Sequence, residues 1–489
     1  MKRWLWLVPV AAAGVGLWFA VGQKKTPPTP QALTFLFTCD IRGRLVPCGC
    51  FTGQLGGLTR IATLFGPNSA TDEIRVDVGD ALAGGADYER IQYRYIQQGF
   101  ARMGYEALNV GQREARLSAA QLREIKASAP VPMLSANLLD RATGAPIFES
   151  YKIIHRGPWR IALVGVLDGR GLGDALGEGL AVEPMEVALG KLLPQLKGRA
   201  DAIALLAFAD EDALTGLARQ FYELDVILGG KVHQPSQQLV KENRSLILST
   251  TNESRAVGVL QTRLLAPGRM EAIKGEVSLV RDDIPQDEDI AALAVAYREE
   301  IRQAKLAIDD PASLREDMVP GVQARASYAG TQSCLTCHRT AGNVWKQSGH
   351  ARAFATLLER KADADPNCLA CHTVGFGTPS GYRREFAAGK LVDVGCESCH
   401  GPGSDHVAVR TFGGEATTHF RPIGAGDCQK CHHGEFSRPF TWDQFWPHIM
   451  HRKEALPGKG PVTVTPRVYL KIPSPNAVGI SPVPHTPRE

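Results

Sequence analysis

One five-residue pattern, C-x-x-C-H, occurs four times in the last third of this 489-residue chain. In each copy the two thiols lie about one helical turn apart, and an imidazole follows at once. Thiols at this spacing form thioethers to a porphyrin and the histidine then binds its iron, so the pattern is typical of c-type haem attachment. We therefore predict four covalently attached c-type haems. The attachment residues are Cys334, Cys337, His338, Cys368, Cys371, His372, Cys396, Cys399, His400, Cys428, Cys431 and His432.

Zinc ribbons and redox dithiols also use C-x-x-C pairs and are the alternatives to haem. Zinc ribbons do not require a histidine after every pair, and thioredoxin-like motifs do not come in fours. The repeated histidine therefore favours haem. Apolar side chains are sparse across residues 326–455, so we expect the macrocycles themselves to provide much of the core there.

This haem segment resembles the tetrahaem cytochrome c554 family. The resemblance rests on VWKQSGHARA (344–353), CLACHTVGFGTPSGY (368–382), CESCHGPGSDH (396–406) and FWPHIMH (445–451). It implies that His350, His406 and His451 are distal iron ligands, without showing which iron each one serves.

The resemblance also implies that one haem is five-coordinate, and we expect this at the Cys368/Cys371 haem. His419 is the alternative distal ligand there, and His448 is the alternative to His451. His433 directly follows a proximal histidine and cannot reach the same iron. We do not expect His433 or His485 to bind iron.

The region before the haem segment alternates strand-like and helix-like runs, which predicts an α/β fold with helices packed on sheets. We place this domain at residues 32–282. The expected strands are 32–37, 74–78, 161–167, 202–208 and 226–230. The expected helices are 88–103, 183–197 and 211–222. Three later runs, at 245–250, 257–265 and 276–280, predict antiparallel strands at the end of the domain.

Four segments of this domain resemble the metallophosphoesterase domain of the 5′-nucleotidase family: FTCDIRGR (37–44), VDVGD (76–80), GYEALNVGQREAR (104–116) and DVILGGKVH (225–233). The resemblance implies a sandwich of sheets flanked by helices. Of the family's metal ligands, Asp40, Asp80 and His233 remain. The other positions hold Arg42, Gln112, Arg113, Arg116, Lys231 and Phe208.

Three retained ligands do not make a two-metal site, which needs several oxygen or nitrogen ligands on each ion. Arg42, Arg113 and Lys231 would place fixed cations beside Asp40 and Asp80, where the metal ions would lie. We therefore expect a salt-bridge network in place of the metals, no phosphoryl transfer, and a scaffold used for docking.

Eleven cysteines are present, and Cys39, Cys48 and Cys50 lie outside the haem motifs. The resemblance suggests thiol chemistry in this region. The three cysteines could form a redox dithiol, a soft metal site completed by Cys39, or one disulfide with one free thiol.

The N-terminal segment 1–22 combines Lys2 and Arg3 with an uncharged stretch long enough to span a bilayer. We expect a membrane anchor, with a cleaved signal peptide as the alternative. Because c-type haem is attached outside the cytoplasmic membrane, the bulk of the chain is predicted to be periplasmic. Residues 23–31 are then a linker, 283–325 a helical linker, and 456–489 a proline-rich tail.

The formal net charge of +4 gives no reason to expect nucleic-acid binding, because haem propionates would alter that sum and no Lys/Arg run is present. The leading hypothesis is a periplasmic electron-transfer protein with unknown redox partners. The alternatives are a haem enzyme acting on a small nitrogen or sulfur compound at an open iron, and a haem-linked phosphoesterase.

Overall fold

The computed structural model describes residues 29–47, 55–67, 71–251, 253–304, 306, 327–384, 389–413, 420, 422–432 and 440–451. Several predictions therefore lie outside the described residues: the N-terminal anchor (1–22), Cys48, Cys50, His419, His433, His485 and the tail (456–489). Among the residues that are described, no helix combines the length and the apolar character of a transmembrane segment.

The first part of the chain is built on two six-stranded sheets. The first sheet has the order β14 (Arg269–Leu279), β13 (Ala256–Ala266), β1 (Gln31–Thr38), β2 (Glu73–Asp77), β3 (Ala107–Asn109) and β4 (Met133–Leu134). The second has the order β11 (Val240–Glu242), β12 (Ser245–Ser249), β10 (Val226–Gly230), β9 (Ala202–Phe208), β7 (Trp159–Leu167) and β6 (Tyr151–Arg156). A small sheet pairs β5 (Leu138–Asp140) with β8 (Leu180–Val182).

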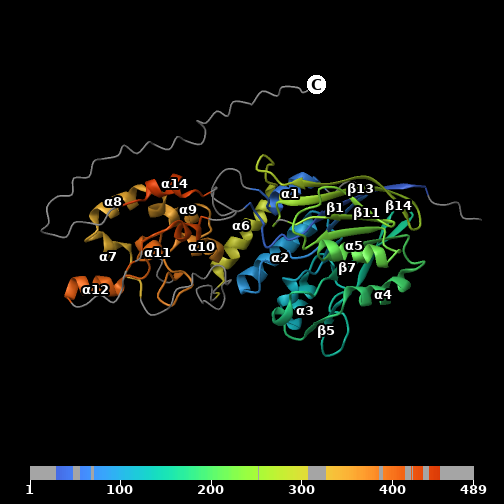
Figure 1. Cartoon of the computed structure of the whole chain (residues 1–489), viewed down its shortest axis with the longest axis horizontal. Helices are drawn as coiled ribbons and strands as arrows, with labels where there is room; N and C mark the ends of the chain where they lie inside the picture. The colour runs from blue at the N-terminus through green and yellow to red at the C-terminus, as the bar shows by residue number, and fades with distance from the viewer. Residues whose placement is uncertain are drawn as a thin grey trace, which may run out of the picture.

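The expected strands and helices all form, and the α/β sandwich is confirmed (Figure 1). One pairing prediction was wrong. Strands β13 and β14 are antiparallel, as predicted, but β12 pairs parallel with β10. The antiparallel neighbour of β12 is the short β11, which the sequence analysis did not predict. The second sheet is therefore parallel from β7 to β12 and antiparallel at its two edge strands, β6 and β11, because the chain enters β12 through β11 rather than directly from β10.

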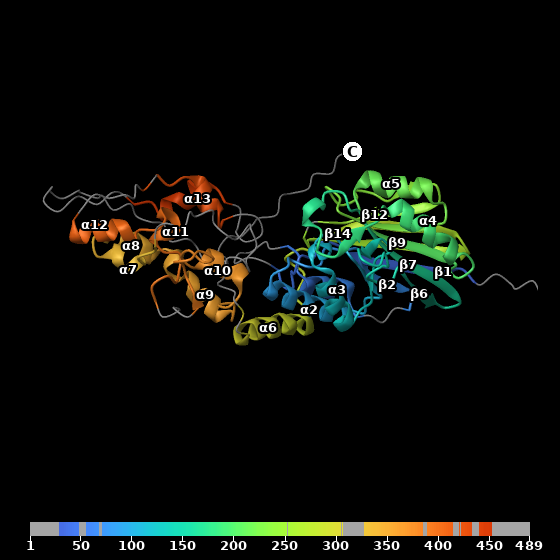
Figure 2. The same ribbon diagram turned by 90° about the horizontal axis from the view of Figure 1, so that it is seen from below.

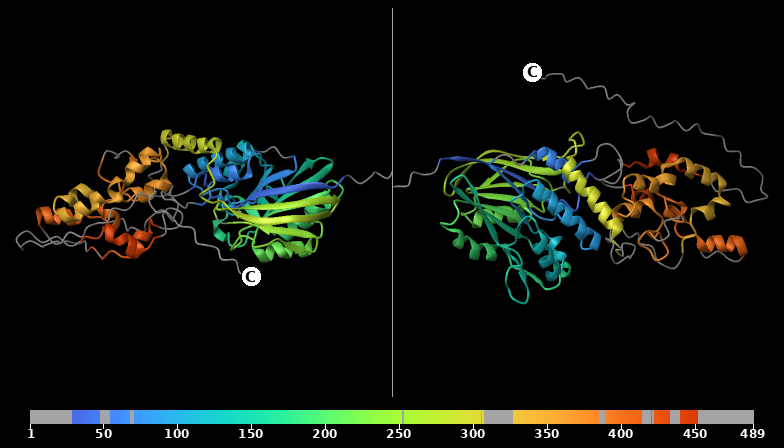
Figure 3. Two further views of the ribbon diagram at one scale, coloured as in Figure 1. Left: turned by 90° about the horizontal axis from the view of Figure 1, so that it is seen from above. Right: turned by 180° about the vertical axis from the view of Figure 1, so that it is seen from behind.

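Strands β7 and β9 show why the sequence forms two packed layers. Both are apolar on both faces, as expected for strands in the centre of a parallel sheet. Ile161 and Leu206 join the core between the sheets, whereas Val164 and Leu205 pack towards α4 (Met185–Leu196) and α5 (Glu211–Gln220). Figures 2 and 3 show α4 and α5 covering that outer face.

The remaining helices of the first part are α1 (Leu58–Phe65), α2 (Asp87–Arg102), α3 (Ala119–Ser128) and α6 (Glu288–Gln303). Helix α6 falls in the stretch expected to be a helical linker. Its N-terminus is capped by Asp287, which accepts a hydrogen bond from Ile290 N at 2.9 Å. Its apolar face, including Leu293 and Ile301, belongs to the same core cluster as α1 and α2. The linker helix is thus packed on the first part of the structure.

The second part, residues 327–451 as far as they are described, consists of short helices, and we call it the helical part (Figure 1). Its elements are α7 (Thr331–Leu335), α8 (Arg339–Gln347), η5 (Gly349–Arg352), α9 (Ala353–Glu359), α10 (Pro366–His372), α11 (Cys396–His400), α12 (Ser404–Phe412), α13 (Ala425–Gln429), α14 (Trp442–Phe445) and η8 (Trp446–His448).

The polypeptide core of the helical part is small. It runs from Phe354 to Leu391 and so surrounds the second C-x-x-C-H motif. In contrast, α12, α13 and α14 bury no residue at all. Helices this short and exposed are not stable alone in water, so another apolar body must support them.

Candidate haem sites and a phosphoesterase-like strand-end site

Each C-x-x-C-H motif lies on a helical turn. The second and third motifs fall within α10 and α11. In the first motif His338 N donates to Cys334 O at 2.9 Å, and in the fourth His432 N donates to Cys428 O at 2.8 Å. The backbone therefore presents both thiols and the imidazole of each motif in the compact arrangement that attachment to one porphyrin needs.

The three histidines expected as distal ligands each lie beside a different proximal histidine. The ring centroids are 6.2 Å apart for His338 and His406, 5.8 Å for His400 and His451, and 6.0 Å for His432 and His350. A metal ion holds an imidazole nitrogen at about 2 Å, so two rings sharing one metal should have centroids roughly 6 Å apart. The spacing of all three pairs fits an iron held between them.

The electrostatics of these rings also suit metal binding, which requires neutral imidazole. Burial, together with the neighbouring His432 and His372, lowers the pKa of His350 to about 4. Burial likewise lowers the pKa of His400 and of His406 below the ordinary value.

The fourth proximal histidine, His372, makes a different contact. Its Nδ1 lies 2.7 Å from the carbonyl oxygen of Ala353. A hydrogen bond of this kind fixes the tautomer and orientation of a ligating imidazole and leaves Nε2 for the metal.

The four motifs follow one another in space in a different order from the sequence. The thiol of Cys334 contacts that of Cys396. Cys399 in turn lies beside Cys428 and Cys431, and Cys431 contacts Cys371. The attachment sites therefore form a row in the order first, third, fourth and second.

The phosphoesterase-like positions gather at the carboxyl ends of parallel strands, where ligands bind in open α/β sheets. Figures 1 and 3 show β1 running towards the helical part, so this edge lies on that side of the molecule. Asp40, Asp80, Arg42 and Lys231 all adopt positive φ angles, between 47° and 62°. Strained backbone of this kind persists where the surrounding structure fixes it, and clusters at functional sites.

Asp40 is paired with arginine, as expected. Its Oδ1 lies 2.5 Å from Arg42 Nε, and Arg42 also pairs with Glu253. Glu253 binds Arg44 as well, at 2.8 Å. Burial raises the pKa of Asp40, and the charge of Arg42 offsets only part of that rise. Glu253 could not be predicted from the sequence, because it belongs to none of the four segments that resemble the family.

The Asp80 carboxylate is held more closely by a backbone N–H group than by a cationic side chain. Its Oδ1 accepts from Arg113 N at 2.8 Å, whereas Arg113 Nε is 3.8 Å from Oδ2. The buried Glu114 accepts from Asp80 N and from Leu82 N. Burial, together with the nearby Glu114 carboxylate, raises the pKa of Asp80 to about 8.

Lys231 does not join Asp40 and Asp80. Its Nζ lies 2.9 Å from Asp168 Oδ2, and Gln112 donates to Asp168 O at 2.8 Å. Burial alone would raise the pKa of Asp168, but hydrogen bonds from Arg170 and Lys231 outweigh it and lower the pKa. Asp168, which directly follows the predicted strand 161–167, is thus a site residue that the sequence analysis missed.

The remaining strand-end residues are not arranged to bind a metal ion. The His233 side chain is 93% exposed and lies 3.5 Å from Glu211, and Arg116 is exposed. Phe208 and Cys39 are buried at the strand ends; Cys39 Sγ contacts the carbonyl oxygen of Gly79 at 3.6 Å. Among the described residues, no group of three or more His, Cys, Asp or Glu side chains is arranged to hold a metal ion.

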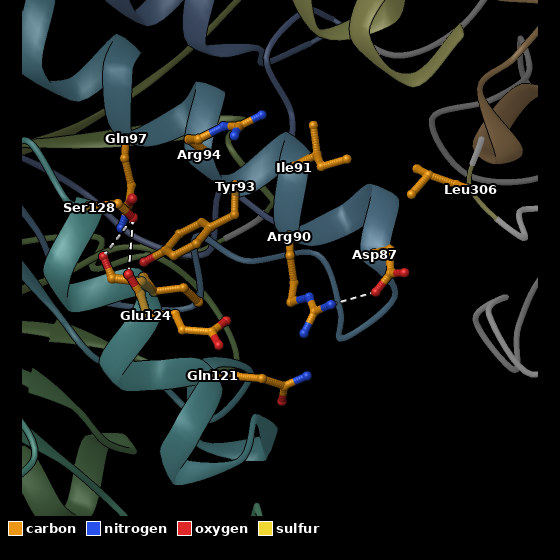
Figure 4. Close-up of a pocket in the computed structure, with 11 residues that line it drawn as sticks. Asp87, Arg90, Ile91, Tyr93, Arg94, Gln97, Gln121, Glu124, Ser128 and Leu306 are labelled. Carbon is orange, nitrogen blue, oxygen red and sulfur yellow. Dashed lines mark hydrogen bonds and ion pairs between the residues drawn. The ribbon is translucent and has the colours of Figure 1, made fainter. Parts of the chain in front are cut away.

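A pocket of about 340 Å³ lies elsewhere, between α2 and α3 with Leu306 at its margin (Figure 4). Its lining includes the Asp87–Arg90 ion pair. None of the predicted site residues lines it, so it gives no support to a substrate site.

Comparisons with known proteins divide the chain in the same two parts. Residues 333–401 match the family Cytochrome c554 and c-prime. The chain is 35% identical over 108 residues to cytochrome c-554 of Nitrosomonas europaea, covering 19% of this chain and 46% of that protein. It is 27% identical over 284 residues to a 5′-nucleotidase of Vibrio cholerae, covering 50% of this chain and 49% of that protein.

Among solved structures, NAD nucleotidase of Haemophilus influenzae has a TM-score of 0.51 at 13% identity, covering 65% of this chain and 69% of that one. This likeness shows the fold alone. The chain spans about half the length of the curated relatives it matches. The chain joins a 5′-nucleotidase-like metallophosphoesterase domain to a cytochrome c554 domain at residues 333–401.

Proposed function

We propose that this protein is a tetrahaem electron-transfer protein whose nucleotidase-like domain does not hydrolyse phosphate esters. The observation that carries the proposal is the set of three histidine pairs at 5.8 to 6.2 Å, each joining one proximal histidine to one distal candidate. When bound, c-type haems supply one-electron transfer at iron.

The chain's own residues would determine how each iron behaves. His338 with His406, His400 with His451 and His432 with His350 would each hold one haem iron between two imidazoles and leave it no site for another ligand. Because all three distal candidates are then used, we assign the five-coordinate iron to the Cys368/Cys371 haem. His419, the alternative ligand for that iron, lies outside the described residues.

Haem content and spin state test this assignment directly. We expect four haems per chain by the pyridine haemochromogen assay, all retained after acidified organic extraction. Electron paramagnetic resonance of the ferric protein should show three low-spin centres and one high-spin centre. Fewer than four haems, or four low-spin centres, would contradict it.

A second function is compatible with the same assignment. A haem held by His372 without a second histidine would leave its iron free to bind a small nitrogen or sulfur compound. The observation that favours this function is that all three distal candidates lie beside other proximal histidines. Turnover of nitrite, hydroxylamine or sulfite that is abolished by carbon monoxide at the high-spin haem would select an enzyme over an electron carrier.

Two ion pairs support the proposed inactivity of the nucleotidase-like domain. Arg42 forms an ion pair with Asp40, and Lys231 forms one with Asp168. Two carboxylates at the strand ends are therefore already paired with fixed side-chain cations. Elemental analysis of the purified full chain is expected to find iron at the haem stoichiometry and no further manganese, zinc or iron. Two additional metal equivalents with phosphatase turnover would refute the proposal.

A c-type cytochrome domain indicates an extracytoplasmic location, since haem is attached there. We further propose that the protein is periplasmic, held to the inner membrane by residues 1–22, and exchanges electrons with protein partners. Fractionation of cells expressing the chain with and without residues 1–22 tests the anchor: only the full chain should sediment with membranes.

A further inference from the structure

We infer that Asp393 is a positioning residue for two haems at once, those attached at the second and fourth C-x-x-C-H motifs. It acts through residues 349–354, which we call the ligand segment because they include His350. The inference rests on the proposed function, since it requires haem at both motifs. It goes beyond that function by naming a residue, outside the motifs and the distal ligands, that sets the potentials of two of the four haems.

The ligand segment reaches two proximal histidines. The ring of His350 lies 6.0 Å, between centroids, from that of His432 in the fourth motif. Three residues further on, the carbonyl oxygen of Ala353 lies 2.7 Å from Nδ1 of His372 in the second motif. Figures 1 and 2 show α9, which begins in this segment, beside α10, which carries His372.

These two contacts act on haem potential in different ways. The potential of a haem depends on its axial ligands and on the hydrogen bonds that those ligands make. A displacement of the ligand segment would therefore disturb the fourth-motif haem through its distal ligand. It would disturb the second-motif haem through the hydrogen bond on its proximal ligand.

A neighbouring stretch, residues 391–394, holds the ligand segment near both ends, and we call it the anchor segment. Val394 N donates to His350 O at 3.2 Å, and Asp393 Oδ1 accepts from Phe354 N at 2.8 Å. Phe354 N belongs to the first turn of α9, where amide groups have no partner within the helix. The Asp393 carboxylate therefore supplies a hydrogen bond that the helix itself cannot, and fixes the start of α9.

The anchor segment is itself fixed to the polypeptide that follows the second motif. Val392 forms an antiparallel bridge with Thr373, and Val374 N donates to Leu391 O at 2.8 Å. Leu391 and Val374 both belong to the small core of the helical part. The anchor segment is thus a firm support, and Asp393 is the side chain by which it holds the start of α9.

The backbone of Asp393 is a second sign that this position is constrained. Its φ angle is 68°, in the left-handed region. Residues with a Cβ rarely adopt this conformation, although Asp and Asn tolerate it better than most others. Strained backbone of this kind persists where the surrounding structure fixes it. Glycine would keep the backbone conformation and lose the acceptor oxygen, whereas asparagine would keep both.

The test compares Asp393→Gly with Asp393→Asn in the full haem-loaded chain. Both variants remove the same negative charge, but only Asp393→Asn retains an oxygen that can accept from Phe354 N. The difference between them therefore reports the hydrogen bond and not the charge. Potentiometric titration, followed by absorbance and by electron paramagnetic resonance, resolves the high-spin haem from the low-spin haems. His350→Ala identifies the fourth-motif haem as the low-spin centre that becomes high-spin.

Relative to Asp393→Asn, we expect Asp393→Gly to shift two midpoint potentials, that of the high-spin haem and that of the fourth-motif haem. The first-motif and third-motif haems should keep their potentials, because their distal candidates, His406 and His451, lie on other segments. Equal potentials in the two variants, a shift of only one of the two haems, or a shift of all four would overturn the inference.

Asp287 provides the matched control, because its Oδ1 also accepts from a backbone N–H at the start of a helix, that of Ile290 in α6, at 2.9 Å. Relative to Asp287→Asn, Asp287→Gly should lower the free energy of unfolding and shift no potential. Shifts equal to those of the Asp393 variants would show that the loss of any helix cap disturbs the haems, and would overturn the inference.

A further variant reaches the same support from another side and serves if Asp393→Gly does not assemble. Trp345 Nε1 donates to Val394 O at 2.9 Å, so Trp345→Phe removes a bond to the anchor segment but keeps an aromatic ring. The same two haems should shift, and four unchanged potentials would overturn the inference. A wild-type protein with fewer than four haems would instead overturn the proposed function, so the two failures are distinguishable.

Discussion

The imidazole rings of His400 and His451 lie with their centroids 5.8 Å apart, whereas within the described part of the chain His448, the other candidate from the same segment, makes no such ring contact with a proximal histidine. The structure therefore distinguishes two histidines that the sequence left as alternatives. His451→Ala should convert one low-spin haem into a high-spin haem, because an axial position opens. His448→Ala is the matched control and should leave all spin states unchanged. Electron paramagnetic resonance of the two ferric variants measures this, and the opposite result would reassign the ligand.

Removing Arg42 should destabilise the nucleotidase-like domain, because the Asp40 carboxylate is 4% exposed and would lose its cation. We expect Arg42→Gln to lower the free energy of unfolding by about 2 kcal/mol, since a buried charge left unpaired costs more than an exposed one. Urea denaturation followed by circular dichroism measures the change.

Arg123→Gln serves as the control for Arg42→Gln. Arg123 also pairs with an aspartate, Asp140, but its own side chain is 55% exposed. Exposed ion pairs contribute about 0–1 kcal/mol. Equal losses in the two variants would show that Arg42 makes only an ordinary surface ion pair.

Asp80 should make the nucleotidase-like domain less stable at alkaline pH. Its pKa in the folded state is raised to about 8, so the folded protein keeps a proton that the unfolded chain releases near pH 4. This contribution to stability is complete below about pH 4 and is lost as the pH rises through about 8.

Asp80→Asn should therefore gain stability relative to the wild type between pH 5 and pH 9, by roughly 2 kcal/mol. This is less than the full pKa shift corresponds to, because Arg113 and Glu114 also interact with Asp80. Asp201→Asn is the control, because the hydrogen bond from Arg160 lowers the pKa of Asp201 and its carboxylate is ionised at both pH values. This variant should lose the same stability at pH 5 and at pH 9. Denaturation curves at the two pH values, with hydrogen exchange of the β1 and β2 peptides, measure both. A wild-type stability that rises from pH 5 to pH 9 in these peptides would contradict the prediction.

Gly230 is required because a Cβ at this position would lie 2.2 Å from Cys39 Sγ. Gly230→Ala should lower the free energy of unfolding by about 1–3 kcal/mol, the usual cost of overpacking a core. In the double variant with Cys39→Ala the sulfur is gone, so the loss should be smaller than the sum of the two single losses. Additive losses would mean that Phe208 or Val78, rather than Cys39, restricts the position.

The sequence predicted much of the fold because its signals are local. Apolar runs such as 161–167 and 202–208 identify buried parallel strands wherever they pack, and β7 and β9 form there. The exception was residues 245–249, whose partner depends on where the chain enters the sheet. Burial and alternation specify a strand, but not which neighbour it pairs with.

The attachment residues were equally local, since the chemistry of each C-x-x-C-H motif is contained in five neighbouring residues. Which distal histidine lies beside which proximal one was decided only by the tertiary structure, because each pair joins separate helices. The same holds for Lys231, which the sequence placed beside Asp40 and Asp80 and the structure places on Asp168. Charge alone gives a side chain many possible partners, and long-range packing of the strand ends selects one.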